Sequence, residues 1–327
     1  MSVLAFIESN EGKFKKSAFE VLSHSFEIAS KSGSKVVAVC CGSFSEDEIS
    51  KLQKFGASKV LKISNANVSK FMSQPYASLM YEAAKQENAN FVVLANSYSG
   101  RGLAPRLSVK LKAGLIAGAN GEFRKEADGS FVFKKNAFSG KAFAEIKINS
   151  PIAIIALSPN AVKVTENSST NFEVIDFNPE LNEKDFLVKS IDIKRAAGKI
   201  PLPEAELVVS AGRGMKGPEN WGMIEELATE IGAGTACSKP VSDAGWRPHE
   251  EHVGQTGIAI APNLYIAIGI SGAIQHLAGV SSSKVIVVIN KDPEAPFFKA
   301  ADYGIVGDAF EIIPKLIQAV KKFKNPQ

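Results

Sequence analysis

The sequence has little cysteine, and its cysteines are not spaced to hold a metal or a disulfide framework. The three are Cys40, Cys41 and Cys237, and they form no C-x-x-C pair. This excludes zinc knuckles and iron–sulfur ligand sets and argues against a secreted disulfide scaffold. Cys40 and Cys41 end an apolar run, so we expect them to be buried thiols.

Long apolar runs and an excess of one charge are also missing. No segment approaches the roughly 20 apolar residues that cross a bilayer, so we expect no direct membrane insertion. With 38 basic and 34 acidic residues, the chain shows no sign of nucleic-acid binding. The N-terminus reads as a strand and not as a signal peptide, so we expect a cytoplasmic protein, or a mitochondrial-matrix protein if the chain is a matured organelle form.

Motifs for hydrolysis and phosphoryl transfer are absent too. There is no Gly-x-Ser-x-Gly elbow and no Walker loop, and His249-Glu-Glu-His252 has neither the order nor the spacing of a zinc protease motif. No Ser–His–Asp set or pair of carboxylates stands out. We therefore expect no catalytic residues and no metal site.

What the sequence does contain is an alternation of strand and helix patterns. A length of 327 residues suggests about two domains. In the first half the alternation predicts a parallel sheet with helices on both faces. The expected elements are strand Val3–Glu8, helix Lys13–Ser32, strand Lys35–Cys41, helix Glu46–Phe55, strand Lys59–Ile63, helix Phe71–Gln86, strand Phe91–Ala95 and a helix ending near Lys112.

The pattern changes in the middle of the chain. Asp128-Gly129 predicts a hairpin between Glu122–Arg124 and Ser130–Lys135. We expect the strands that follow to be antiparallel additions at a sheet edge, and these are Phe143–Ile148, Ile152–Leu157, Phe172–Asp176 and Phe186–Ile193. A composition change then predicts a linker at 194–203, between an N-terminal domain (1–193) and a C-terminal domain (204–327).

A second series of strands and helices follows the linker. The expected strands are Glu206–Ser210, Leu264–Ile270, Lys284–Ile289 and Gly304–Val306, and the helices are Glu219–Ile231, Ser271–Ala278 and Ala309–Lys324. The predicted fold class is thus α/β with two domains, each with a mainly parallel sheet flanked by helices. The C-terminal domain is expected to be Rossmann-like.

The clearest local signal opens the second domain. Gly212-x-Gly214-x-x-Gly217 follows a predicted strand and precedes a predicted helix, as a dinucleotide-binding turn requires. Arg213 adds a charge that can pair with phosphate. The acidic residue expected about 20 positions later, which would bind a nicotinamide ribose, is missing.

Three further segments carry polar groups where a ligand would bind. The loop Val253-Gly-Gln-Thr-Gly257 offers amide and hydroxyl groups, although a simple turn also explains it. Ser271-Gly272 stands between a strand and a helix, where backbone N–H groups favour an anion. Asn290 follows a strand, at the edge where ligands bind in open α/β sheets.

Taken in order, these segments resemble the α subunit of the electron transfer flavoprotein family, most specifically over 206–310. The resemblance is carried by Ser210-Ala-Gly-Arg-Gly, Asp243-Ala-Gly-Trp246, Val253–Gly257, Ser271-Gly-Ala-Ile-Gln-His-Leu-Ala-Gly279, Ile289-Asn-Lys-Asp-Pro-Glu-Ala-Pro296 and Ala301-Asp-Tyr-Gly-Ile-Val-Gly-Asp308. It implies a nucleotide-hydrolase-like N-terminal domain that serves mainly as a subunit interface. It also implies an FAD site in the C-terminal domain, completed by a β subunit that carries AMP or a second FAD.

The resemblance also implies which residues line the FAD site. These are Arg213, Ser238, Lys239, Val253, Gly254, Gln255, Thr256, Ser271, Gly272, Ala273, Ile274, Gln275, His276, Asn290, Asp308 and Ala309. Thr256 would reach flavin N5, His276 would lie near the pyrimidine edge, and Asn290 and Asp308 would contact ribose or adenine. Lys239 stands where many members have arginine, so positive charge is kept while the planar stacking group is lost.

The resemblance implies an electron carrier and not an enzyme with its own substrate turnover. Its donors would be flavin dehydrogenases such as acyl-CoA dehydrogenases, and its acceptor a quinone reductase or a similar respiratory acceptor. Two alternatives remain open from the residues. One is an NAD-dependent dehydrogenase that uses the Gly212–Gly217 loop. The other is a nucleotide-binding sensor that uses the loop Ser97–Gly102 of the first domain.

Overall fold

The chain folds into two compact units, described here one at a time. The computed structural model describes residues 1–138, 140, 142–169, 171–192 and 200–325. The first unit comprises Met1–Ala137 and Phe143–Lys194, and the second comprises Phe138–Ala142 and Arg195–Gln327. Most of the expected linker, 194–203, lies outside the described residues.

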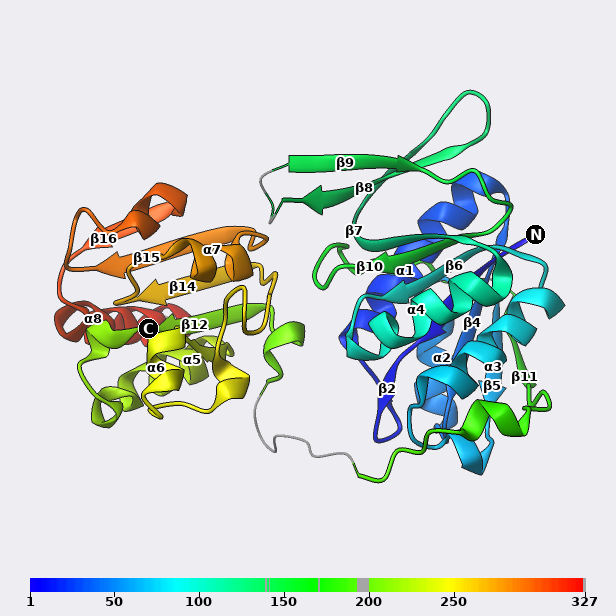
Figure 1. The fold of residues 1–327 in the computed structure, drawn as a ribbon, viewed down its shortest axis with the longest axis horizontal. Coiled ribbons are helices and arrows are strands. Elements are labelled where there is room, and N and C mark those ends of the chain that lie inside the picture. Colours follow the sequence, from blue (N-terminus) through cyan, green and yellow to red (C-terminus); the bar gives the residue numbers. More distant parts are fainter. Residues whose placement is uncertain (139, 141, 170, 193–199, 326–327) are drawn as a thin grey trace. The chain divides into compact units, whose positions relative to one another are not determined.

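The first unit is built on a nine-stranded sheet in the order β11-β5-β4-β1-β6-β10-β7-β8-β9 (Figure 1). Its strands are β1 Ser2–Ile7, β4 Lys35–Cys41, β5 Lys59–Ile63, β6 Ala89–Ala95, β7 Gly114–Lys125, β8 Phe131–Ala137, β9 Ala142–Lys147, β10 Ala153–Leu157 and β11 Glu173–Asp176. β2 Ser9–Asn10 and β3 Lys13–Phe14 form a separate small hairpin. The helices are α1 Lys16–Ser32, α2 Glu46–Lys54, α3 Ser73–Gln86 and α4 Tyr98–Leu111.

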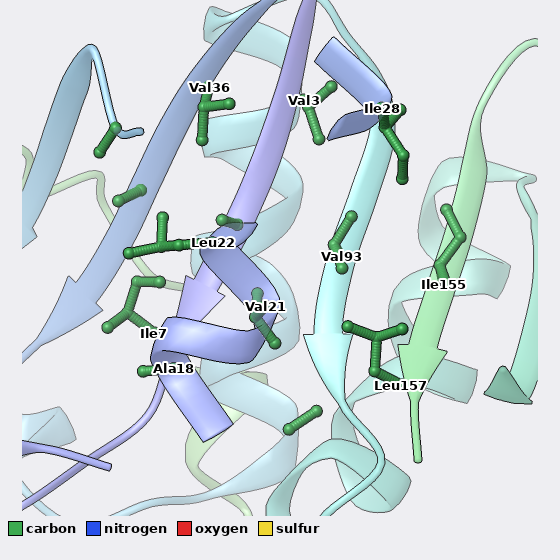
Figure 2. Close-up of a cluster of buried hydrophobic side chains, with 14 of the residues drawn as sticks. Val3, Ile7, Ala18, Val21, Leu22, Ile28, Val36, Val93, Ile155 and Leu157 are labelled. Carbon is green, nitrogen blue, oxygen red and sulfur yellow. The ribbon is translucent and has the colours of Figure 1, made fainter. Parts of the chain in front are cut away.

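Two layers of helices cover this sheet, because its central strands are apolar on both faces. In β1, Val3, Ala5 and Ile7 face one core, which α1 and α2 complete. Leu4 and Phe6 face the other core, which α3 and α4 complete. Figure 2 shows the first of these cores, where the apolar side chains of α1 meet those of β1 and its neighbours.

The hairpin at Asp128-Gly129 forms as expected, with β7 and β8 antiparallel. The other expected antiparallel additions are wrong in part. β10 is parallel and lies between β6 and β7, and β11 is parallel to β5 at the far edge. Local sequence pattern does not encode strand direction, because direction depends on which strand becomes the neighbour.

The expected strand Phe186–Ile193 is also wrong within the described residues. Glu183–Phe186 is a 3₁₀ turn, closed by a capping box between Asn182 and Asp185. The apolar side chains after it are open to solvent, with Leu187 84% and Ile191 91% exposed. Their apolar character suggested a strand, but no sheet face covers them.

The second unit has five strands in the order β13-β12-β14-β15-β16, all parallel (Figure 1). They are β12 Leu207–Ala211, β13 Gly234–Cys237, β14 Leu264–Ile268, β15 Val285–Asn290 and β16 Tyr303–Val306. The helices are α5 Gly222–Ile231, α6 Lys239–Asp243, α7 Ile274–Val280 and α8 Ala309–Lys324. β13 and α6 were not predicted, because Gly234-Thr-Ala-Cys237 and the helix after it are too short to show a period.

This unit is also a three-layer structure. α5 and α8 pack on one face of the sheet through Leu227 and Ile313. On the other face, Val280 of α7 and Phe297 pack against Tyr265 of β14. The order 2-1-3-4-5 is that of flavodoxin-like doubly wound folds, and it places the topological switch point between β12 and β14.

Candidate cofactor site

The carboxyl ends of the five parallel strands of the second unit bring the predicted site residues to one edge of its sheet. Arg213 follows β12, Ser238 and Lys239 follow β13, and the segment 269–276 follows β14. Asn290 ends β15, and Asp308 follows β16. In open α/β sheets, ligands bind at this edge, beside the switch point.

The glycines of Gly212-x-Gly214 are required by the packing of two loops at the switch point. A Cβ on Gly214 would lie 2.6 Å from the Cα of Gly269, and a Cβ on Gly212 would overlap the Gly269 carbonyl. At the third glycine, Gly217, a Cβ would meet the carboxylate of Glu219. Backbone packing of the two loops therefore explains Gly212 and Gly214, whereas the neighbour of Gly217 is a side-chain carboxylate.

The loop after β14 is fixed by its neighbours on both sides. Gly272 has φ +84°, and a Cβ there would lie 2.5 Å from the Phe297 Cα. The Phe297 N–H donates to the Ser271 carbonyl at 3.1 Å. Asn290 Nδ2 donates to the Ile270 carbonyl at 2.9 Å, and its Oδ1 accepts from the Asp292 N–H at 3.1 Å. Thus Asn290 supports this loop with both groups of its amide.

The segment 271–275 leads into α7 and is open to solvent at Ser271, Ala273, Ile274 and Gln275. Ala273 is the residue before the helix, and its methyl group cannot accept hydrogen bonds. The first N–H groups of the helix are thus available to an acceptor from outside the chain. This is the place where the sequence predicts a phosphate.

The loop Val253–Gly257 is held beside α7. The Val253 N–H donates to the Cys237 carbonyl at 3.1 Å, and the Gln255 N–H donates to the Gln275 carbonyl at 2.7 Å. A Cβ on Gly279 of α7 would lie 2.5 Å from the Gly254 Cα, so the two segments touch through backbone. The side chains of Gln255 and Thr256 are exposed. The fold thus brings together two segments that lie about 20 residues apart in the sequence.

His276 lies beneath these two segments and is only 7% exposed. Its Nε2 is 2.8 Å from the hydroxyl of Tyr265. Burial, together with the nearby His252, lowers the pKa of His276 to about 4. The imidazole is therefore neutral at pH 7 and contributes no positive charge to the site.

Arg213 and Lys239 place positive charges near this edge, and their side chains are exposed. Lys239 Nζ pairs with Asp243 Oδ2 at 3.0 Å along α6. Ser238 is buried and its N–H donates to the Ala211 carbonyl. Both cations can reach an anionic ligand, because neither is fixed in the core.

At the far side of the sheet, Asp308 and Ala309 begin α8. Asp308 Oδ1 accepts from the Phe310 N–H at 2.8 Å, so this carboxylate caps the helix. Ala309 is buried at the first helical position. The structure therefore gives Asp308 and Asn290 contacts within the protein, in addition to any contact with a nucleotide.

Sequence reasoning missed the residues that support the site from behind. Arg247 Nε pairs with Glu251 Oε2 at 2.7 Å, and its Nη1 pairs with Glu225 Oε1 at 2.9 Å. These pairs hold the segment that precedes Val253 against α5. The i, i+4 spacing of Arg247 and Glu251 was a usable signal. Tyr265 gave no signal, because an inward tyrosine in a buried strand looks like any core residue.

Comparison with known proteins decides the family. The family model described as "Electron transfer flavoprotein FAD-binding domain" matches residues 201–281. The family model described as "Electron transfer flavoprotein domain" matches residues 3–181. The chain belongs to the electron transfer flavoprotein α-subunit family. It is accordingly a subunit of an electron carrier and not an enzyme in its own right.

Relatives align over nearly the whole of this flavoprotein subunit. The electron transfer flavoprotein subunit alpha of Thermoanaerobacterium thermosaccharolyticum is 39% identical, over 98% of this chain and 97% of that protein. The Bacillus subtilis subunit alpha is 35% identical, over 98% and 97%. The acryloyl-CoA reductase electron transfer subunit beta of Anaerotignum propionicum is 32% identical, over 99% and 96%.

The second unit of this flavoprotein subunit fits a flavin nucleotide in two respects. Nδ1 of His276 is buried and makes no hydrogen bond of ordinary geometry with any described residue, so a polar partner at this position would be favourable. The exposed amides before α7 suit a phosphate.

Two other possibilities were tested within the described residues. In that part of the chain, no group of three or more His, Cys, Asp or Glu side chains is placed to hold a metal ion. None of the helices there is long and apolar enough to cross a membrane.

The loop Ser97–Gly102 of the first unit was the other candidate nucleotide site. Ser97 Oγ accepts from the Gly100 N–H at 3.0 Å and caps α4. The same hydroxyl donates to the Glu8 carboxylate. The chain's own carboxylate thus lies at the position where an anionic ligand would approach this helix, which disfavours the sensor hypothesis.

Proposed function

We propose that the chain is the FAD-binding subunit of a heterodimeric electron transfer flavoprotein. It would accept electrons from flavin dehydrogenases, such as those that act on acyl-CoA, and pass them to a quinone reductase or another respiratory acceptor. One observation carries the proposal. The five parallel strands of the second unit gather the predicted flavin-site residues at a single sheet edge, within a domain that matches an FAD-binding family.

Different residues of this edge would bind different parts of FAD. The backbone of Ser271–Ala273 would bind a phosphate, and Arg213 would add a charge-assisted hydrogen bond. The loop Val253–Thr256 would lie along the ring system, with the Thr256 hydroxyl at N5. Asn290 and Asp308 would act mainly by holding their loops, because their side-chain groups already bond to the protein.

When bound, FAD supplies the ability to take up and release electrons, which no side chain of this site has. The protein sets how easily it does so. Lys239 places a positive charge near the edge and would favour the reduced, anionic flavin. His276, neutral and buried, would act as a polar group at the pyrimidine side and not as a fixed cation.

The direct test is a visible spectrum of the chain co-expressed and co-purified with its β subunit, followed by stepwise reduction. We expect a yellow complex whose flavin is reduced and reoxidised reversibly. A colourless complex that cannot be reconstituted with FAD would refute the proposal. Hydride transfer from NADH without a partner dehydrogenase would instead support the dehydrogenase alternative.

We further propose that the β subunit carries AMP or a second FAD. The nucleotides released by denaturing the complex can be separated and counted. Equal amounts of AMP and FAD would identify AMP, and two FAD per heterodimer would identify the second flavin. Donors are tested by adding a catalytic amount of an acyl-CoA dehydrogenase and its acyl-CoA substrate to the oxidised complex and measuring how fast the flavin absorbance of the complex falls.

A further inference from the structure

The Tyr265–His276 pair joins the core of the second unit to the predicted FAD site. Tyr265 lies on β14, is completely buried, and its hydroxyl is 2.8 Å from His276 Nε2. Phe297 packs on both rings, with centroid distances of 6.3 Å to Tyr265 and 5.7 Å to His276. The imidazole therefore has one orientation, with Nε2 toward Tyr265 and Nδ1 on the opposite side.

The surroundings of the pair indicate the direction of its hydrogen bond. Among the described residues, His276 Nε2 is the one hydrogen-bond partner of the Tyr265 hydroxyl. A completely buried phenol that only accepted from Nε2 would leave its own O–H without an acceptor, which is unfavourable. The hydroxyl is therefore the donor, and the neutral imidazole carries its proton on Nδ1.

We propose that Tyr265 is a positioning residue: its phenol holds His276 in the tautomer with the proton on Nδ1, and that N–H is then a donor for a polar atom of FAD. The role in FAD binding rests on the proposed function, whereas the tautomer does not. Nδ1 is buried and has no hydrogen-bond partner among the described residues, so its N–H can meet an acceptor on the cofactor. In the other tautomer, Nδ1 would present a lone pair and could not donate.

The tautomer can be measured without any cofactor. The chain has only four histidines, so ¹⁵N-histidine labelling gives four imidazoles, and a His276→Gln variant identifies the signals of interest. In the wild-type chain we expect Nδ1 of His276 to be protonated and Nε2 to be an acceptor. In Tyr265→Phe, which keeps the ring that fills the core, we expect this preference to weaken and the Nε2 resonance to shift.

Tyr76→Phe is the matched control. Tyr76 is also buried, and its hydroxyl donates to the Val68 carbonyl at 2.9 Å in the first unit. Tyr76→Phe removes a comparable hydrogen bond in a different core, far in sequence from the predicted FAD site. We expect the His276 resonances of this variant to match those of the wild type.

The second readout is FAD affinity in the complex with the β subunit. We expect Tyr265→Phe to bind FAD roughly tenfold more weakly than the wild type, which is the size of effect expected for one lost hydrogen bond. Tyr76→Phe should bind FAD as the wild type does. The midpoint potential of the flavin should also differ from the wild-type value in Tyr265→Phe and not in Tyr76→Phe.

Each part of the proposal can fail separately. A wild-type His276 protonated on Nε2, or unchanged His276 resonances in Tyr265→Phe, would overturn the positioning role even if Tyr265→Phe folds poorly. Changed resonances with wild-type FAD affinity and potential would overturn the role of Tyr265 in FAD binding. Absence of FAD from the wild-type complex would refute the proposed function and leave the tautomer result standing.

Discussion

Among the single residues of the predicted site, those that bond to the protein differ from those that face solvent. Asn290 and Asp308 have their polar groups engaged, by the Ile270 carbonyl and the Phe310 N–H among others. Arg213, Lys239 and Thr256 are exposed at the same edge. Substitution of the first pair should therefore reduce stability and binding together, whereas substitution of the exposed residues should change the properties of the flavin without unfolding the unit.

Lys239→Ala tests the effect of charge on the flavin. We expect a lower midpoint potential, because the reduced flavin loses a nearby cation. Stability should change by only about 0–1 kcal/mol, since the ion pair to Asp243 is exposed. Asp243→Asn keeps the lysine and removes its partner, so the potential should rise. Equal potentials in all three proteins, measured by spectroelectrochemical titration, would show that this charge does not act on the flavin.

His24 predicts a dependence of stability on pH in the first unit. It is completely buried, neither ring nitrogen has a hydrogen-bond partner among the described residues, and burial lowers its pKa to about 4. The unfolded chain takes up a proton near pH 6.5 while the folded chain does not. Stability therefore falls as the pH drops from about 6.5 to 4, by about 3 kcal/mol.

Replacement of this histidine should remove most of that loss. We expect His24→Leu to lose about 3 kcal/mol less than the wild type between pH 7 and pH 4 in urea denaturation followed by circular dichroism. His249→Gln, on an exposed loop, is the control and should behave as the wild type does. An equal loss in His24→Leu would mean that the buried imidazole is not the titrating group.

Among the structural elements, the loops after β12 and β14 depend on each other. Gly212 and Gly214 of one loop touch Gly269 of the other through backbone atoms. The spacing that suggests a dinucleotide turn is in fact a requirement of loop packing at the switch point. This contact fixes the start of the segment that leads to Ser271 and α7.

Gly212→Ala should therefore destabilise the second unit by about 1–3 kcal/mol, because the added Cβ overlaps the Gly269 carbonyl. Gly222→Ala is the matched control, since a Cβ there has open space at the start of α5. It should be neutral or slightly stabilising. Both tryptophans, Trp221 and Trp246, lie in the second unit, so fluorescence-detected unfolding reports on it directly. Equal stabilities of the two variants would contradict the packing argument.

In the whole molecule, two units with separate cores share one chain, and the flavin site predicted here belongs to the second. FAD should therefore protect the second unit more than the first. At a free concentration 100 times the dissociation constant, binding contributes about 2.7 kcal/mol to the stability of the part that binds.

Hydrogen exchange of the complex, with and without added FAD, tests this distribution. We expect slower exchange in 201–281, strongest in the segments 253–257 and 270–276. The strands of the first unit, β1 and β4 for example, should change little. Equal protection throughout both units would mean that the flavin binds elsewhere, or that the two units unfold together in spite of their separate cores.

The order of elements follows from local patterns in the sequence, and the predicted membership of the flavin site follows from the resemblance of its motifs to those of the family. Apolar periods mark β4, β5 and α8 at their observed bounds, and the glycine- and polar-rich motifs mark the loops of the site. These patterns can be recognised in the sequence because each depends on residues that are close together in the chain. Short elements such as β13 show no period, and the exposed stretch after Phe186 shows a misleading one.

What required the tertiary structure was everything that depends on which segments become neighbours. The parallel direction of β10 and its central place come from its partners, not from its own residues. The contact of Gly212 with Gly269, and the hydrogen bond between Tyr265 and His276, join segments that carry no sequence signal of one another. A local pattern records the burial and conformation of a residue, whereas the partner across a sheet or loop is chosen by the packing of the whole unit.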